Sequence, residues 1–194
     1  MDIVYSVHIQ AMGARTGPVG QCIASAVDLS KVKVFCDIGG SAGTLAAAIK
    51  ECAPHLTVLS LDLPSLTEDV SKHPLPGVTY VAGSFFESVP EADMYTLKHI
   101  LHDWSDDKCI TILRNVHKAM KADGTLIILE TILPDLGDIS NAMAKAVDMV
   151  MLNVAGGLER SAAEWTRLLE QGGFRIEQVV DTSMRIKVQV CKKI

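Results

Sequence analysis

The sequence has 194 residues, of which 48% are hydrophobic and 21% are charged, and its formal net charge is −5. A chain of this length can bury a substantial core in one domain, and an acidic balance without a basic stripe argues against a nucleic-acid-binding protein. The N-terminus lacks the basic and apolar regions of a signal peptide, and the apolar segment from Ala142 to Leu158 contains Lys145 and Asp148, which makes it too short and too charged to span a membrane.

The cysteines are scattered along the chain without a Cys-x-x-Cys pair, at Cys22, Cys36, Cys52, Cys109 and Cys191. An odd, unclustered set is typical of reduced thiols and indicates neither a disulfide framework nor a zinc site. We therefore expect a soluble cytoplasmic protein that uses no metal and binds neither nucleic acid nor membrane.

Beyond a glycine-containing N-terminal connecting segment (residues 1–30), short β-rich runs alternate with helical patterns. The predicted strands are Val32–Ile38, Thr57–Leu63, Val78–Ala82, Met94–His99, Thr125–Thr131, Arg175–Val180 and Met184–Val190. The predicted helices are Thr44–Cys52, Ser65–Lys72, Asp106–Lys121, Ile139–Leu152 and Ser161–Gln171. This alternation predicts an α/β fold with a mostly parallel sheet covered on both faces. Only three residues join the last two strands, which predicts an antiparallel hairpin.

The first predicted strand ends in the turn DIGGSAG (residues 37–43), which leads into a helix. Such turns usually hold a nucleotide, but this glycine spacing is not the G-x-G-x-x-G of a dinucleotide site. The carboxylate of Asp37 would also repel a pyrophosphate, which disfavours a nicotinamide-dependent oxidoreductase. S-adenosylmethionine fits better, because it has an ammonium, a sulfonium and a ribose whose two hydroxyls Asp62 can accept from.

The run LKHILHDWSDD begins at the end of the fourth predicted strand. It delivers Lys98, His102, Asp103 and Trp104 to the carboxyl edge of the sheet, where open α/β folds bind their ligands. A lone histidine is more often structural than catalytic, but His102 lies in this loop beside an acid and a tryptophan. We therefore interpret His102 as a candidate catalytic residue.

With these motifs in view, the chain resembles the catalytic domain of the S-adenosylmethionine-dependent small-molecule O-methyltransferases. This family includes plant caffeate and flavonoid enzymes and animal acetylserotonin O-methyltransferase. The matching segments are DIGGSAG, LDLP, GVTYVAGSFFESVPEAD, LKHILHDWSDDKC, ILETILP and GGLERSAAEWTRLLEQGGF, in the family's order. The resemblance implies a Rossmann-like class I methyltransferase fold, with seven strands in the order 3-2-1-4-5-7-6 and the seventh antiparallel.

The resemblance also implies a role for individual residues. His102 would be the general base, and Glu130 and Glu159 would position it. The cofactor S-adenosylmethionine would contact Asp37, Gly39, Gly43, Asp62, Leu63, Ser84, Phe85 and Lys98. The acceptor, a small aromatic substrate with a phenolic or hydroxyindole oxygen, would contact Met12, His99, Asp103 and Met151, although a plain core role is equally open for the methionines.

The chemistry of methyl transfer is consistent with a general base that is held by carboxylates. The enzyme must align the acceptor oxygen with the methyl group and remove its proton, and an imidazole with a pKa near 6.5 suits a phenol. A carboxylate on the other ring nitrogen fixes the tautomer and favours the imidazolium that forms.

The sequence departs from the family pattern at several points. Ser41 stands in the middle of a glycine trio, Ser84 replaces an aspartate before the adenine-packing residue, and His99 replaces a tryptophan of the plant enzymes. We also expect the N-terminal helical dimerisation domain of the family to be absent from this chain. We therefore expect the isolated chain to bind its cofactor weakly, and to form the family-type homodimer only with that domain. A non-catalytic S-adenosylmethionine-binding or scaffold protein remains the alternative.

Overall fold

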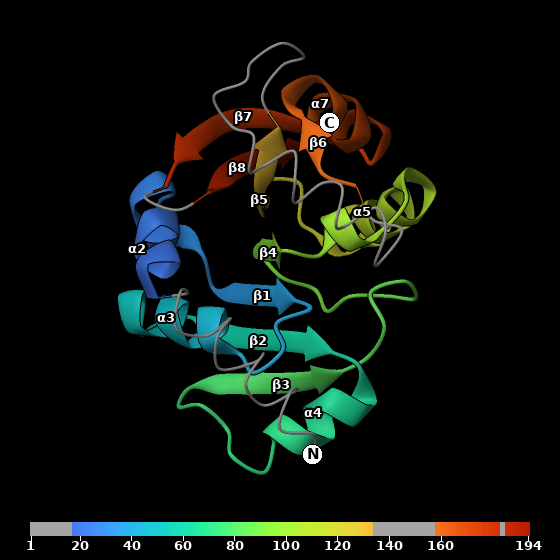
Figure 1. Cartoon of the computed structure of the whole chain (residues 1–194). Coiled ribbons are helices and arrows are strands. Elements are labelled where there is room, and N and C mark those ends of the chain that lie inside the picture. Colours follow the sequence, from blue (N-terminus) through green and yellow to red (C-terminus); the bar gives the residue numbers. More distant parts are fainter. Residues whose placement is uncertain (1–16, 134–157, 183–184) are drawn as a thin grey trace.

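The computed structural model describes residues 17–133, 158–182 and 185–194, which form a mixed sheet with helices on both faces (Figure 1). Its strands are β1 (Val34–Ile38), β2 (Thr57–Asp62), β3 (Val78–Ala82), β4 (Met94–Lys98), β5 (Thr125–Leu133), β6 (Arg160–Ser161), β7 (Phe174–Asp181) and β8 (Ile186–Lys193). Its helices are α2 (Gly17–Ala26), α3 (Thr44–Cys52), α4 (Pro64–Val70), α5 (Asp106–Ala119) and α7 (Ala162–Gln171), with 3-10 turns η1 (Leu29–Lys31) and η2 (Leu101–Asp103).

The strand order is β3-β2-β1-β4-β5-β8-β7, and the two-residue β6 pairs with the end of β5. The five strands β1 to β5 pair in parallel, whereas β8 is antiparallel to both β5 and β7. The predicted order and the predicted C-terminal hairpin are therefore confirmed, with β7 and β8 as the sixth and seventh predicted strands. The sequence did not indicate β6, because a strand of two residues has no periodicity to detect.

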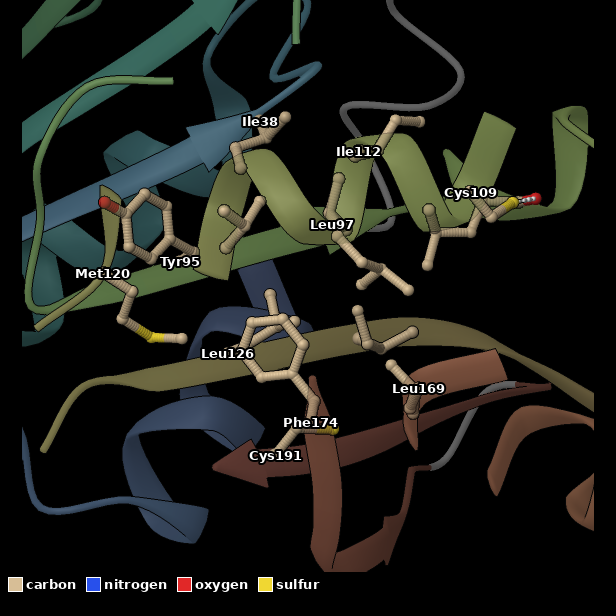
Figure 2. Close-up of a cluster of buried hydrophobic side chains, with 14 of the residues drawn as sticks. Ile38, Tyr95, Leu97, Cys109, Ile112, Met120, Leu126, Leu169, Phe174 and Cys191 are labelled. Carbon is tan, nitrogen blue, oxygen red and sulfur yellow. Dashed lines mark hydrogen bonds between the residues drawn. The ribbon is translucent and has the colours of Figure 1, made fainter. Parts of the chain in front are cut away.

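The sheet separates two hydrophobic clusters, because alternate side chains of each strand point to opposite faces. Along β1, Phe35 belongs to the cluster beneath α2 and α3, whereas Cys36 and Ile38 belong to the cluster beneath α5 and α7. Figure 2 shows the second cluster, in which Leu97 and Leu126 lie between α5 and the sheet. Both faces of the sheet are therefore covered, as the apolar strands predicted.

The helix α2 lies within the predicted connecting segment (residues 1–30), where the sequence analysis had predicted no helix. Val19 and Ile23 are fully buried, and their four-residue spacing places both on the face that packs against the sheet. Gly20 faces α3 so closely that a Cβ on it would lie 2.8 Å from the Cβ of Ala48. Gly20 therefore permits α2 and α3 to pack closely. In sequence, a glycine with this role looks the same as a glycine in a turn. The predicted helix Ile139–Leu152 lies outside the described residues.

A buried arginine fixes the loop that follows β4. The guanidinium of Arg160 donates from Nη1 to the carbonyl of Leu101 at 3.1 Å and from Nη2 to the carbonyl of Trp104 at 2.9 Å. It also pairs with Asp106 at 2.8 Å, although that carboxylate is 61% exposed while the arginine side chain is 1% exposed. A planar fork with five donors can satisfy several carbonyls at once, which a lysine cannot do.

We predict that the carbonyl contacts of Arg160 stabilise this loop more than its charge pair with Asp106 does. The substitution Arg160→Lys should lower the free energy of unfolding by about 3 kcal/mol, because buried carbonyls lose their donors. The control Asp106→Asn keeps an acceptor on a side chain that is 61% exposed, leaves the carbonyl contacts in place, and should cost less than Arg160→Lys. Urea unfolding of both variants measures the difference, and equal losses would contradict this assignment.

Candidate active site

Glu130, in the second half of β5, holds the backbone of the loop that carries His102. Its Oε1 accepts from the amides of Ile100 and Leu101, both at 3.0 Å, and lies 3.4 Å from the amide of His102. The Glu130 side chain is fully buried. A charged acceptor forms a stronger bond than a neutral one, so this carboxylate fixes the η2 turn and, with it, the position of the imidazole.

The Nδ1 atom of the His102 imidazole lies near two carboxylates, those of Glu130 and Glu159. Its Nδ1 is 3.1 Å from Glu159 Oε1 and 3.7 Å from Glu130 Oε2. Glu159 reaches this place because the neighbouring Arg160 pairs with Ile132 of β5 and because the amide of Leu158 donates to the carbonyl of His102 at 2.7 Å. The structure therefore brings together the three residues that the sequence analysis assigned to catalysis.

The surroundings of His102 favour its protonated form. Burial of the ring would lower its pKa, but the hydrogen bond with Glu159 and the charges of Glu130, Asp103 and Glu159 outweigh burial and raise the pKa of His102 to about 9. An ionised Glu159 can only accept, so Nδ1 carries the proton in the neutral ring. The basic lone pair is then on Nε2, which lies 3.5 Å from Asp103 Oδ1.

His99 is held in an unusual backbone conformation beside this group. Its φ is +53°, in the left-handed region that few non-glycine residues adopt. Its ring lies 5.3 Å from the His102 ring, between centroids, and its Nδ1 is 3.5 Å from Glu130 Oε2. The predicted acceptor residues His99 and Asp103 thus both lie close to His102, whereas Met12 and Met151 lie outside the described residues.

The glycine turn after β1 brings its backbone close to the loop that carries His102. Gly39 has a φ of +68°, and a Cβ on it would lie 2.3 Å from Cδ1 of Ile100. Gly43 has a φ of +77°, and a Cβ there would lie 2.9 Å from the hydroxyl of Tyr80. Both positions therefore require glycine. Ser41 adopts a φ of +51° without that freedom, which costs about 1–2 kcal/mol for a residue with a Cβ.

The carboxylate of Asp62 lies across this turn. Its Oδ2 accepts from the amide of Ser41 at 2.9 Å, and its Oδ1 accepts from the amide of Leu63 at 2.8 Å. Each carboxylate oxygen has a second lone pair, so Asp62 retains acceptors for a ligand. Leu63, which is 54% exposed, begins the turn into α4.

Asp37 and Lys98 link the glycine turn to the loop that carries His102. Burial raises the pKa of Asp37 to about 7, although a 2.6 Å hydrogen bond from Thr96 and the charge of Lys98 oppose that rise. Burial likewise lowers the pKa of Lys98, opposed by the charges of Asp37 and Glu130. Lys98 thus interacts with a carboxylate from each part of the site. Nothing in the sequence pattern had indicated the contribution of Thr96.

Two aromatic rings of the segment after β3 pack against the loop that carries His102. The rings of Phe85 and Phe86 meet Trp104 at centroid distances of 6.3 and 4.9 Å. The amide of Asn115, on α5, donates to the carbonyl of Phe85 at 2.9 Å, a contact that sequence reasoning missed. The hydroxyl of Ser84 accepts from the amide of Phe86 at 3.3 Å, so it acts within its own turn.

Comparison with known proteins shows which family this arrangement belongs to. The model of the O-methyltransferase domain family matches residues 4–175. O-methyltransferase 12 of Dictyostelium discoideum is 40% identical over 191 residues, which are 95% of this chain and 50% of that protein. A protein of the same organism named "Probable inactive O-methyltransferase 11" is 37% identical over 78% of this chain and 46% of its own length.

A solved structure of human N-acetylserotonin methyltransferase in complex with SAM superposes with a TM-score of 0.86 at 28% identity, over 96% of this chain and 55% of that one. The chain thus spans about half the length of the curated relatives it matches. None of the helices in the described ranges is long and apolar enough to cross a membrane. The family match and the shared fold agree with the motifs read from the sequence, and the chain belongs to the O-methyltransferase domain family.

Proposed function

We propose that this chain carries a methyltransferase site that moves a methyl group from S-adenosylmethionine to a hydroxyl of a small aromatic compound. The observation that carries the proposal is the 3.1 Å contact between His102 Nδ1 and Glu159. This contact leaves Nε2 of His102 as the nitrogen that can accept a proton. The chain also belongs to the O-methyltransferase domain family. An imidazole held in one tautomer by a carboxylate is suited to remove a proton from a hydroxyl.

The residues around the glycine turn fit S-adenosylmethionine. Gly39 and Gly43 leave the space that a Cβ would fill, and Asp62 offers two acceptor oxygens suited to a ribose diol. The carboxylate of Asp37, which Thr96 binds through its hydroxyl, suits a cationic group better than a phosphate. When bound, this cofactor supplies a methyl group on a sulfonium, which makes the carbon electrophilic.

His102 supplies the proton acceptor of the reaction. Its Nε2 takes the hydroxyl proton, and the imidazolium that forms is stabilised by Glu159 on Nδ1 and by the charge of Glu130. A base with a pKa of about 9 is well matched to a phenol, whose pKa is about 10. Asp103, 3.5 Å from Nε2, is placed to orient the acceptor oxygen.

Two features favour a second candidate, a protein that binds the cofactor without turnover. Ser41 strains the glycine turn at a φ of +51°, and Ser84 uses its hydroxyl within its own turn. One relative carries the word "inactive" in its name. In this second candidate, S-adenosylmethionine binds in a calorimetric titration and no phenol or hydroxyindole is methylated.

The first prediction of the methyltransferase proposal concerns the base. The substitution His102→Ala should lower kcat by about 10²–10⁴-fold while the affinity for S-adenosylmethionine changes little, because only proton transfer is lost. Calorimetry and a methyl-transfer assay measure the two quantities separately. Loss of cofactor affinity together with turnover would make His102 a structural residue.

The second prediction concerns pH. With EDTA present, kcat/KM for the acceptor should rise about tenfold per pH unit and level off near the His102 pKa of about 9. The rise occurs because the neutral ring is the active form, and it should move to lower pH in Glu159→Gln, which removes a carboxylate that favours the imidazolium. If the rise in kcat/KM occurs at the same pH in wild type and in Glu159→Gln, then Glu159 does not raise the pKa of the base.

The third prediction concerns the cofactor. The substitution Asp62→Ala should weaken S-adenosylmethionine about tenfold or more, since two ribose hydroxyls would lose their acceptor at a cost of about 1–3 kcal/mol. The control Asp69→Ala removes an exposed acid of α4 and should leave the affinity unchanged. Equal affinities in a calorimetric titration of the two variants would place the ribose elsewhere.

A further inference from the structure

We propose that His99, His102 and Glu130 form a binding site for one divalent transition-metal ion of the Zn²⁺ type, and that the ion switches off the base. The three side chains each offer one donor atom, and these atoms lie within 4.8 Å of one another. Binding of the ion rests on the geometry of the chain alone. Its effect on methyl transfer rests on the proposed function.

The two distances from Glu130 are close to those that such an ion requires, whereas the donor atoms as a set are bounded only by 4.8 Å, so binding would draw the two rings closer together. Glu130 Oε2 lies 3.5 Å from His99 Nδ1 and 3.7 Å from His102 Nδ1. Bonds of about 2.0–2.1 Å to a tetrahedral zinc place neighbouring ligand atoms about 3.3–3.4 Å apart. Two imidazoles and one carboxylate, with a fourth position open, form a donor set that zinc uses in enzymes.

Two of the donor atoms are buried and have no hydrogen-bond partner among the described residues. These are His99 Nδ1 and Glu130 Oε2, and the whole Glu130 side chain is fully buried. A buried polar atom without a partner is costly, so each such atom requires an explanation. The other oxygen of Glu130 holds the backbone of the loop, which fixes Oε2 toward the two rings. An ion between the rings would satisfy both orphan atoms.

The surrounding charge also favours a cation. Glu159 lies 3.1 Å from His102 Nδ1, and Asp103 lies 3.5 Å from its Nε2. Glu130 and these two neighbours supply three carboxylates, of which one is offset while His102 is protonated. Lys98, which interacts with Glu130, offsets one more of these negative charges. The cluster is therefore negative before an ion binds.

The strained backbone of His99 maintains the arrangement. A φ of +53° is adopted readily by glycine and is tolerated by asparagine. With this conformation, the His99 ring stands beside the His102 ring, with an interplanar angle of 35°. His99 can therefore be replaced by Asn or Gly, which fit this backbone conformation and remove only the imidazole.

A metal ion on Nδ1 of His102 would abolish its basicity at the other nitrogen. A neutral imidazole that ligates a metal through Nδ1 carries its proton on Nε2. The Nε2 lone pair that the proposed reaction needs is then absent, and the contact between Nδ1 and Glu159 is exchanged for a metal bond. The ion would therefore act as an inhibitor and not as a cofactor.

The test is a titration of the whole chain with Co²⁺, followed by competition with Zn²⁺. Wild type should develop the visible absorption of a Co²⁺ ion with nitrogen and oxygen ligands at one equivalent, and Zn²⁺ should displace it. His99→Asn and His99→Gly should each weaken binding by at least about tenfold, since the loss of a supporting partner already costs about 10–100-fold in metal affinity. The matched control His117→Asn, on α5 and outside the cluster, should bind as wild type does.

Three results would overturn the site: no binding of Co²⁺, binding that is unchanged in both His99 variants, or a thiolate charge-transfer band that disappears in Cys52→Ser, whose cysteine is exposed. Thermal unfolding of the His99 variants shows that they are folded. The absorption readout needs no turnover, so it stands even if the chain proves inactive. If the chain is active, Zn²⁺ should inhibit wild type with the affinity found in the titration, and activity that persists at saturating Zn²⁺ would refute the switch.

Discussion

The bond between the Glu130 carboxylate and the backbone amides of Ile100 and Leu101 is the constraint on which the site depends. It joins the end of β5 to the loop after β4, so the sheet itself determines where His102 stands. Both hydrogen bonds are 3.0 Å long and are made by a carboxylate that is fully buried, so salt screens them little. Because one oxygen of Glu130 is used in this way, the other is left to face the imidazoles of His99 and His102.

The two glutamates therefore have different tasks, although the sequence presents them as a pair. Glu159 contacts the imidazole of His102 directly, whereas Glu130 acts mainly through the backbone. Arg160 completes the frame by binding carbonyls on both sides of His102. In this arrangement the base is positioned by elements that are distant in sequence, and the glycine turn at Gly39 touches the same loop.

The sequence predicted what depends on local pattern. Alternating strands and helices predicted the parallel sheet, and the three-residue connection predicted the hairpin. The grouping of His102, Glu130 and Glu159 was implied by the resemblance to a known family. Long-range contacts had no local pattern to reveal them. The pairing of β6 with β5, the fork of Arg160 on loop carbonyls and the left-handed backbone of His99 all arise from tertiary structure. The approach of Gly20 to Ala48 likewise had no local signal, because a glycine that permits helix packing and one that makes a turn look alike in sequence.

The central claim is that carboxylates hold His102 as an Nδ1–H tautomer of raised basicity. Nitrogen-15 NMR of the histidine side chains, titrated with EDTA present and assigned through His102→Ala, measures both properties in one experiment. The account predicts a His102 pKa of about 9 and a neutral ring protonated on Nδ1. A pKa near the ordinary value of about 6.5, or a neutral ring protonated on Nε2, would contradict it.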